Sequence, residues 1–327
     1  MVKVMRKLLY TLAGLGALAL MASCNKETGP GLRGEGGPAV QATFTVQLPV
    51  GMATKAISDG TQADKLLFMA YDQNGKHLDL DQTVPVSGFA ATVSVNLVKG
   101  IKYQFVFWAQ KDGQYTSKFS EDKKSLTIAP AEMMNSDGWD AFYWHEPLAE
   151  VTGPFTTSIT LRRPFAQINV GAPVTLDASN NREGGDFYAA SKSGILIDNT
   201  LTTGYKIRVP NKLNLLDGSV EGAEEITMTK ASYPGNAGEF LTVDGVKYDY
   251  AAMAYVLAMP DADTQNLELS IYTKQHSADV NLIRPVPNVP VRRNYRTNIL
   301  GNVFTVSGNF NITVDQNFSG SDYGINL

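Results

Sequence analysis

Residues that could perform catalysis or bind a metal are few in this 327-residue sequence, and they lie far apart. Three histidines are present: His77, His145 and His276. They share no ligand spacing, whereas a zinc site needs clustered His, Cys or carboxylate side chains. Gly-x-Ser-x-Gly and phosphate-binding Gly-rich loops are absent, and the two Asp-x-Asp pairs lack the other ligands of a calcium loop. We therefore expect no catalytic residues, no metal and no cofactor.

Cys24 is the only cysteine, and its position predicts a covalent modification. A basic segment, residues 1–7, precedes an apolar stretch, residues 8–21, that is followed by Ala22, Ser23 and Cys24. This order is typical of an export signal, and the stretch is shorter than the roughly 20 apolar residues of a membrane span. The cysteine resembles that of a bacterial lipobox, where the thiol receives lipid (palmitate) and becomes the new N-terminus. An ordinary signal peptide with an incidental cysteine is the alternative.

Composition limits the class of protein further. Hydrophobic residues make up 43% of the chain, as in a globular protein, and the net charge of −4 disfavours nucleic acid as a partner. A second cysteine for an intrachain disulfide is lacking. We predict a signal peptide over residues 1–23, a flexible Gly- and Pro-rich tether over 24–39, and globular structure after it.

Period-two alternation predicts β-strands from residue 40 onward. The predicted strands of the first half are 40–48, 65–71, 91–97, 103–109, 125–129 and 156–161. Turn signals separate them at Asp59-Gly60, Gln73-Asn-Gly75, Lys99-Gly100 and Lys111-Asp-Gly113. Short strands at regular spacing with such turns indicate an all-β sandwich.

A second set of strands follows Arg162 and predicts a second domain. Its expected strands are 166–170, 194–197, 205–209, 251–259 and 267–273. The proline-rich segment 284–291 is expected to be an extended connector. The predicted organisation is two tandem β-sandwich domains, residues 40–161 and 162–327.

Alternation is clearest near the C-terminus, over residues 304–315. Its apolar face consists of Phe304, Val306, Phe310, Ile312 and Val314, and its other face is polar. The first strand, residues 40–48, has the same character. Two interpretations of the terminal strand stay open at this point: donation to another molecule, or pairing within its own domain.

Two further sites follow from residue type. Lys55, before Ala56, lies in a Gly- and Thr-containing loop where a trypsin-like protease could cut. Trp139, Tyr143 and Trp144 form an aromatic cluster, which suits either a ligand-binding loop or a loop folded onto its own core, and we favour the second. Three arginines before the last strand, Arg292, Arg293 and Arg296, are expected to pair with local carboxylates.

The order of these features resembles the fimbrillins, the type V pilins of Bacteroidetes. The resemblance rests on the lipobox, the basic loop at Lys55, and three segments: 135–144 with Asp140-Ala-Phe142, 162–170, and 291–302. It implies transthyretin-like sandwich domains and export to the cell surface as an outer-membrane lipoprotein. It further implies that a protease removes the first strand, and that a strand of the next subunit, often its C-terminal one, fills the groove.

Two functions are therefore expected at this point. The first is a non-catalytic structural subunit of cell-surface fimbriae that supports adhesion. Its partners would be other fimbrial subunits, the outer membrane before processing, and a host or bacterial surface ligand. The alternative is a permanently lipid-anchored surface lipoprotein that binds a glycan or a host protein.

Overall fold

The computed structural model describes residues 37–49, 60–192, 201–233, 240–260, 265–275, 281–305 and 310–315. All of them belong to one compact unit, Gly37–Leu327. Cys24, Lys55, Ala56 and Val306 lie outside the described residues. No described helix has the length and apolar character needed to cross a membrane.

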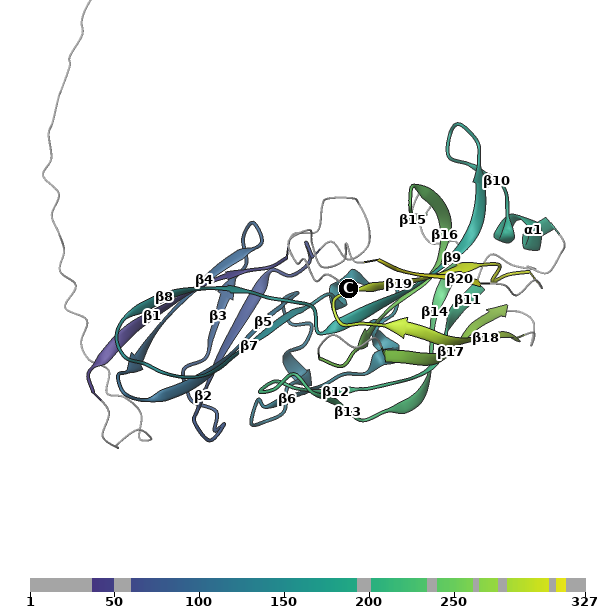
Figure 1. Ribbon diagram of the computed structural model, residues 1–327. Helices are drawn as coiled ribbons and strands as arrows, with labels where there is room; N and C mark the ends of the chain where they lie inside the picture. The colour runs from purple at the N-terminus through teal and green to yellow at the C-terminus, as the bar shows by residue number, and fades with distance from the viewer. Residues whose placement is uncertain are drawn as a thin grey trace, which may run out of the picture. The chain divides into compact units, whose positions relative to one another are not determined.

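The predicted all-β class is confirmed, and one pair of sheets encloses a first core (Figure 1). One sheet has the order β4-β1-β8 and the other the order β3-β2-β5-β7. The strands are β1 (Ala39–Gln47), β2 (Lys65–Asp72), β3 (Gln82–Pro85), β4 (Ala90–Val98), β5 (Lys102–Gln110), β7 (Phe142–Glu150) and β8 (Phe155–Thr160). Apolar side chains of both sheets form a single cluster, so the two sheets form a sandwich.

A second pair of sheets encloses another core. The first of these sheets has the order β15-β16-β9-β19-β20, with β10 also paired to β9, and the second has the order β14-β11-β17-β18. The elements are β9 (Phe165–Leu176), β10 (Arg182–Gly185), α1 (Asp186–Lys192), β11 (Leu201–Val209), β14 (Glu224–Tyr233), β15 (Phe240–Val243), β16 (Val246–Leu257), β17 (Gln265–Gln275), β18 (Asn281–Val291), β19 (Arg296–Gly301) and β20 (Phe310–Asp315). The division into two domains stays a prediction, because the unit that contains both pairs of sheets is compact as a whole.

A third core connects the two pairs of sheets. Residues within or next to the remaining small elements contribute to it: β6 (Ser125–Thr127), β12 (Lys212–Asn214), β13 (Val220–Glu221) and the 3₁₀ turns η1 (Thr116–Lys118), η2 (Pro130–Met133) and η3 (Asp137–Trp139). Met69 and Trp108 of one pair of sheets join Met253 and Tyr255 of the other in this cluster. Strands β2, β5, β9 and β16 are therefore buried on both faces, which explains their nearly continuous apolar sequences.

Turn chemistry agrees with the sequence. The glycines of the four predicted turns, Gly60, Gly75, Gly100 and Gly113, all have positive φ. A positive φ is readily adopted by glycine because it has no Cβ. Gly75, Gly100 and Gly113 follow β2, β4 and β5, and Gly60 precedes β2, as the predicted turns require.

The segment predicted to be a proline-rich connector is instead a strand, β18. It lies at the edge of its sheet and pairs with β17 alone. An edge strand tolerates proline because the missing N–H can face away from the ladder. The pairing shifts register between Leu267 and Leu269, and Asn288 there has a φ of 56°. Edge position and a bulge thus accommodate the prolines.

Candidate functional site

Strand β1 is the element that the predicted processing would remove, and it is paired on both sides (Figure 1). It runs antiparallel to β4, with Phe44 opposite Val93, and parallel to β8, with Phe44 opposite Thr157. Nine residue pairs join it to β4 and six join it to β8. The loss of β1 would therefore open a gap in the middle of a sheet and expose two unpaired strand edges.

The buried face of β1 is apolar and contributes directly to the first core. Ala42, Phe44 and Val46, together with Leu48 directly after the strand, are at most 2% exposed. The Phe44 ring has four aromatic neighbours, with centroid distances from 5.0 to 5.7 Å: Phe68, Phe105, Phe107 and Phe155. The Phe44 ring thus fills a site that is enclosed by four other aromatic rings, and this site suits an apolar aromatic side chain.

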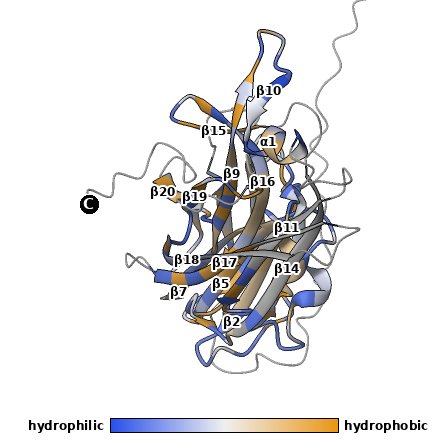
Figure 2. Cartoon of the chain, turned by 90° about the vertical axis from the view of Figure 1, so that its right-hand side faces the viewer, coloured by the Kyte–Doolittle hydropathy of each residue, from blue (hydrophilic) through white to orange (hydrophobic). Residues whose placement is uncertain are grey.

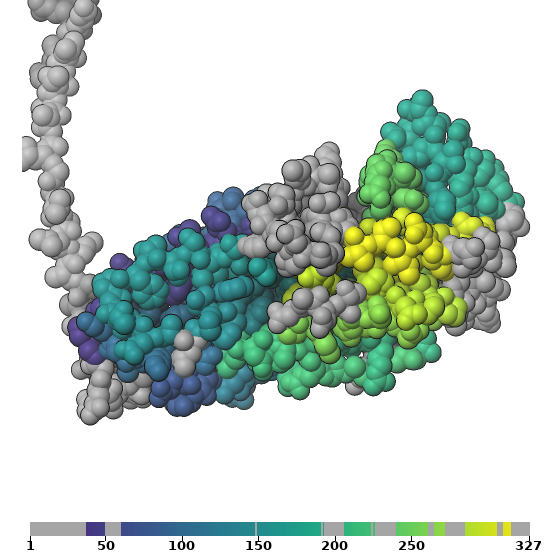
Figure 3. Space-filling view, in the orientation of Figure 1, coloured from purple at the N-terminus to yellow at the C-terminus, as the bar shows by residue number. Residues whose placement is uncertain are grey.

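The predicted C-terminal strand is shorter than expected. Strand β20 begins at Phe310, lies at a sheet edge and pairs with β19 alone. Phe310 and Ile312 are partly buried against the second core, whereas Val314 is 43% exposed. Its residues lie at the surface in the space-filling view (yellow, Figure 3), and apolar residues occur along it in the hydropathy view (Figure 2). The terminal strand is therefore paired within its own fold in this conformation.

Phe304 does not belong to this strand, which corrects the predicted range of 304–315. Its side chain is buried in the second core, and its ring lies 5.7 Å from that of Phe187. The carboxylate of Asp186, at the start of α1, accepts hydrogen bonds from three consecutive backbone N–H groups: Val303 at 2.6 Å, Phe304 at 2.7 Å and Thr305 at 3.0 Å. The Thr305 hydroxyl also donates to it. This buried clamp fixes the chain before β20, and sequence reasoning missed it because its two parts are more than a hundred residues apart.

The aromatic cluster folds onto the interior, as the favoured interpretation predicted. Trp139 is 9% exposed and Tyr143 is 7% exposed, and both belong to the third core. The Tyr143 hydroxyl donates to the Leu215 carbonyl at 2.7 Å, and burial raises the pKa of Tyr143. Trp144 is half-buried and packs against the first core. Two of the three rings thus stabilise packing between elements.

Two of the segments that suggested the family resemblance meet in a buried ion pair. Arg163 Nε lies 2.7 Å from Asp140 Oδ1, and Arg163 Nη2 lies 2.8 Å from Asp140 Oδ2. Both side chains are 1% exposed, and the guanidinium also lies over the Phe142 ring at 4.5 Å. This bidentate geometry is the strong form of a carboxylate–guanidinium contact. It joins the turn before β7 to the segment that leads into β9.

The described histidines have separate partners. His77 Nε2 lies 2.8 Å from Asp81 Oδ1, and His145 Nε2 lies 3.2 Å from Gln104 Oε1, while His276 is outside the described residues. Burial lowers the pKa of His145, although the nearby carboxylates of Asp217 and Glu146 act in the opposite direction. Among the described residues, no three His, Cys, Asp or Glu side chains are grouped for a metal ion.

The described contacts of the three arginines before the last strand join them to neutral groups, and their pairing with carboxylates stays a prediction. Arg293 donates to the carbonyls of Ala258 and Gly218, and Arg296 donates to Gln167 Oε1 at 2.8 Å. Arg292 lies over the Tyr295 ring at 4.6 Å. These contacts fix the segment between β18 and β19 to the body of the fold.

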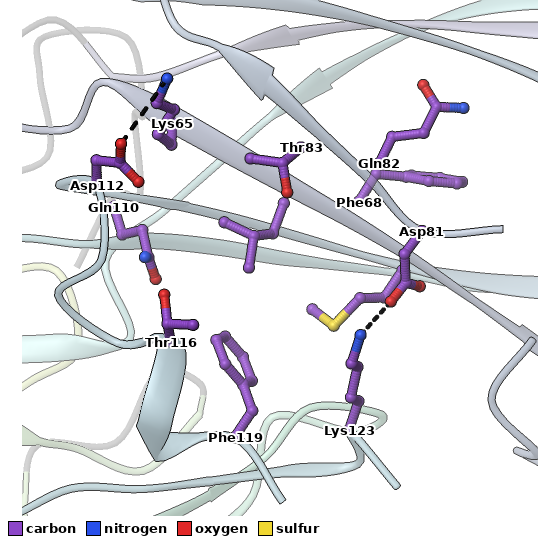
Figure 4. Close-up of a pocket in the computed structure, with 12 residues that line it drawn as sticks. Lys65, Phe68, Asp81, Gln82, Thr83, Gln110, Asp112, Thr116, Phe119 and Lys123 are labelled. Carbon is purple, nitrogen blue, oxygen red and sulfur yellow. Dashed lines mark hydrogen bonds and ion pairs between the residues drawn. The ribbon is translucent and has the colours of Figure 1, made fainter. Parts of the chain in front are cut away.

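A pocket of about 340 Å³ lies beside β2 and β3 (Figure 4). Its lining is mixed: charged Lys65, Asp81, Asp112 and Lys123; polar Gln82, Thr83, Gln110 and Thr116; and apolar Leu67, Phe68, Met69 and Phe119. Lys123 and Asp81 form an ion pair across it, and Lys65 Nζ lies 3.9 Å from Asp112 Oδ2. Sequence reasoning missed this pocket because its residues come from four separate segments.

Two solved structures align with this chain over most of its length. A fimbrial assembly protein from Parabacteroides distasonis is 10% identical, with 85% of this chain and 99% of that chain covered, at a TM-score of 0.46. The fimbrial anchor protein Mfa2 from Porphyromonas gingivalis is 15% identical, with coverages of 80% and 90%, at a TM-score of 0.39.

Family membership comes from the sequence itself. No curated protein matches the chain. Residues 34–326 match a family described as a family of unknown function (DUF6562), and this range includes β1, the buried Asp140–Arg163 pair and β20. Because the match spans nearly all of the sequence, the chain belongs to that family of unknown function, DUF6562.

Proposed function

We propose that this protein is a non-catalytic structural subunit of a cell-surface fimbria that supports adhesion. It is exported as a lipoprotein modified at Cys24, and a protease then cuts after Lys55. The cut separates β1 from the rest of the chain. The terminal strand of another subunit, β20 with Phe310, Ile312 and Val314 on its apolar face, takes the place of β1. The outer membrane holds the precursor through the lipid until that cut, and other fimbrial subunits are the main partners.

The observation that carries this proposal is the position of β1 between β4 and β8. Hydrogen bonds and side-chain packing alone hold β1 once the following loop is cut. Burial of Phe44, Val46 and Leu48 contributes about 1.5–3 kcal/mol each, so β1 leaves slowly. The empty place exposes two strand edges and an apolar trough, and an extended segment satisfies both at once.

A filament follows from the asymmetry of this contact. Each subunit offers its empty β1 place at one site and a strand at a different site. Such a head-to-tail contact does not close on itself, so repeated addition gives an open chain. Slow dissociation of the buried strand would hold the filament together even without covalent bonds between subunits.

The test compares the full-length protein with the variant Lys55→Gln under the same limited digestion by trypsin. The N-terminal residue is determined, and the mass distribution is measured by light scattering after chromatography. The parent should begin at Ala56 and form polymers, and K55Q should stay monomeric because β1 stays connected. A parent that begins at Ala56, has lost β1 and still stays monomeric would refute the proposal.

The pocket beside β2 and β3 favours a second function, a lipid-anchored protein that binds a glycan. Its charged and amide groups suit sugar hydroxyls, and Phe119 and Met69 supply an apolar wall (Figure 4). Glycan-array binding that is lost in Lys123→Ala, with the lipid kept at Cys24, would support this function. Equal binding by the parent and by K123A would exclude this pocket as the glycan site.

A further inference from the structure

Trp144, the remaining ring of the aromatic cluster, borders a second pocket of about 190 Å³. The side chains that matter for binding come from β7, from β8 and from the residue directly after β8: Trp144, Glu146, Thr157, Ser158, Thr160 and Arg162. Ser158 and Arg162 are exposed and the other four are half-buried, so the pocket opens to solvent. It shares no lining residue with the pocket beside β2 and β3 and is therefore a separate site.

The pocket lies where the two sheets around the first core come to an end (Figure 1). Strand β7 is the edge of one sheet and pairs with β5, and β8 is the edge of the other and pairs with β1. A backbone bridge joins these two edges: the Tyr143 N–H donates to the Arg162 carbonyl at 2.8 Å, and the Arg162 N–H donates to the Tyr143 carbonyl at 3.1 Å. The bridge lies next to Trp144 and thus fixes the spacing of the two strands at the pocket.

We propose that this pocket binds an uncharged sugar ring of a glycan. Trp144 contacts the apolar face of the sugar, and Glu146, Arg162 and the hydroxyl groups of β8 bind the hydroxyl groups of the sugar. The inference goes beyond the proposed fimbrial role, because all of these side chains are in place in the uncut chain. It gives that role a ligand chemistry through which adhesion can occur.

Trp144 supplies an apolar surface that is held in one orientation. The ring packs in part against the first core, and its indole N–H donates to Glu146 Oε2 at 2.9 Å. The guanidinium carbon of Arg162 lies 5.9 Å from the centroid of the ring, at the outer limit of a cation–π contact, so Arg162 flanks the ring and does not stack tightly on it. A fixed and partly accessible aromatic ring suits the C–H face of a sugar ring, which is apolar.

The polar groups around the ring match the hydroxyl groups of a sugar. Glu146 uses Oε2 for Trp144, and its Oε1 accepts no hydrogen bond from the described part of the chain. A carboxylate oxygen can only accept hydrogen bonds and a guanidinium can only donate them, whereas a sugar hydroxyl does both. Neighbouring sugar hydroxyls can therefore donate to Glu146 and accept from Arg162, and the Ser158 hydroxyl can take either role.

Charge and size define the class of ligand. The pocket contains one carboxylate, Glu146, and one guanidinium, Arg162, so their formal charges cancel. An acidic sugar would bring a second carboxylate close to Glu146, and like charges in contact lower affinity. Pockets that enclose a whole small molecule measure about 300–1,000 Å³. A pocket of about 190 Å³ that opens to solvent therefore suits one ring of a longer glycan.

An array of neutral and sialylated oligosaccharides tests the inference with the uncut full-length protein. The neutral oligosaccharide that binds most strongly is then titrated by calorimetry, and it should protect the parent's tryptophan fluorescence from quenching by acrylamide. This protection reports Trp144, because Trp108 and Trp139 are only 0% and 9% exposed. Trp144→Ala should weaken binding about tenfold or more, and Trp144→Phe, which keeps an aromatic ring, should weaken it less.

Ser158→Ala and Ser94→Ala form a matched pair of variants. Both serines are exposed on strands of the first pair of sheets, so both variants should fold like the parent, but only Ser158 lines the pocket. S158A should weaken binding about 2- to 10-fold, the range for one neutral hydrogen bond, and S94A should leave it unchanged. Lys123→Ala should also bind like the parent, because Lys123 lines the other pocket.

Three results would overturn the inference. The first is binding that is lost in K123A and kept in W144A and S158A, which would assign the glycan to the pocket beside β2 and β3. The second is selection of sialylated oligosaccharides alone, and the third is no binding to any oligosaccharide on the array. All three leave the proposed exchange standing, because the protein is uncut, and polymerisation after the cut at Lys55 tests that exchange separately.

Discussion

At the scale of single residues, the Asp140–Arg163 pair is the described ion pair in which both side chains are only 1% exposed. We predict that Asp140→Ala lowers the free energy of unfolding by about 3–5 kcal/mol, because Arg163 loses its carboxylate partner in a dry interior. Urea denaturation measures this change. The control is Glu225→Ala, which breaks the exposed pair with Lys206 and should cost less than about 1 kcal/mol. Similar losses in the two variants would contradict a role for burial.

Phe44 should affect both the free energy of unfolding of the uncut protein and the dissociation of β1 after the cut. Phe44→Ala should lower the free energy of unfolding of the uncut protein by about 3–5 kcal/mol, since the cavity lies among four rings. After the cut at Lys55, β1 should also dissociate faster, so polymers should form sooner than in the parent. Gln47→Ala, at an exposed position of the same strand, is the control. The proposed role of Phe44 fails if F44A and Q47A release β1 at the same rate.

His145 gives stability a pH dependence with a defined sign. Burial lowers its pKa in the folded state, so the unfolded chain binds more protons there as the solution becomes acidic. The contribution of neutral His145 is present above the unfolded pKa of about 6.5 and is lost as the pH falls from that value through the lower folded pKa. Urea midpoints near neutral pH and about two units below it should differ less in His145→Gln than in the parent. An unchanged difference would remove His145 as a cause.

At the scale of elements, Val314 separates the two states of the terminal strand. It is 43% exposed in its own fold, so Val314→Asp should leave the melting temperature of the uncut monomer nearly unchanged. In the place of β1 the carboxylate would be buried in the first core, and polymerisation after the cut should be lost. Asn311→Asp adds the same charge on the exposed face and should still polymerise. Assembly of V314D at the parent's rate would contradict the proposed transfer.

The strands that sequence alone predicted well are those with one buried and one exposed face. Alternation in β1 and β4 placed both within one or two residues of the observed bounds. Strand β7 was missed because Ala141, Phe142 and Tyr143 are all buried, so the sequence there does not alternate. Helix α1 has seven residues, too few for a helical period to be recognised.

The features of the candidate site that could not be predicted from sequence are contacts between segments that lie far apart in the chain. The apolar face of the first strand was readable, but its parallel pairing with β8 was not, because local patterns do not encode partners. The clamp between Asp186 and residues 303–305 likewise needs the folded chain, and it explains why the terminal strand begins later than alternation suggested. The apolar face of the first strand was thus predictable, whereas its neighbours were not.

At the scale of the whole molecule, the proposed function depends on one edge strand and one internal strand. The terminal strand occupies an edge where it has one partner, and the first strand occupies an internal place with two. A protein built this way is complete before processing and lacks an internal strand after it. On the proposed function, a single cut controls assembly, rather than the concentration of the protein alone.

The decisive experiment is intact-mass spectrometry of the protein sheared from the surface of cells. The mass identifies the N-terminal residue, and that residue shows whether the first strand has been removed. A subunit that has exchanged its first strand must begin after the cut, so we predict a start at Ala56 and a mass without lipid. A chain that begins at a lipidated Cys24 in assembled surface material would contradict the account, because β1 would still occupy its own place.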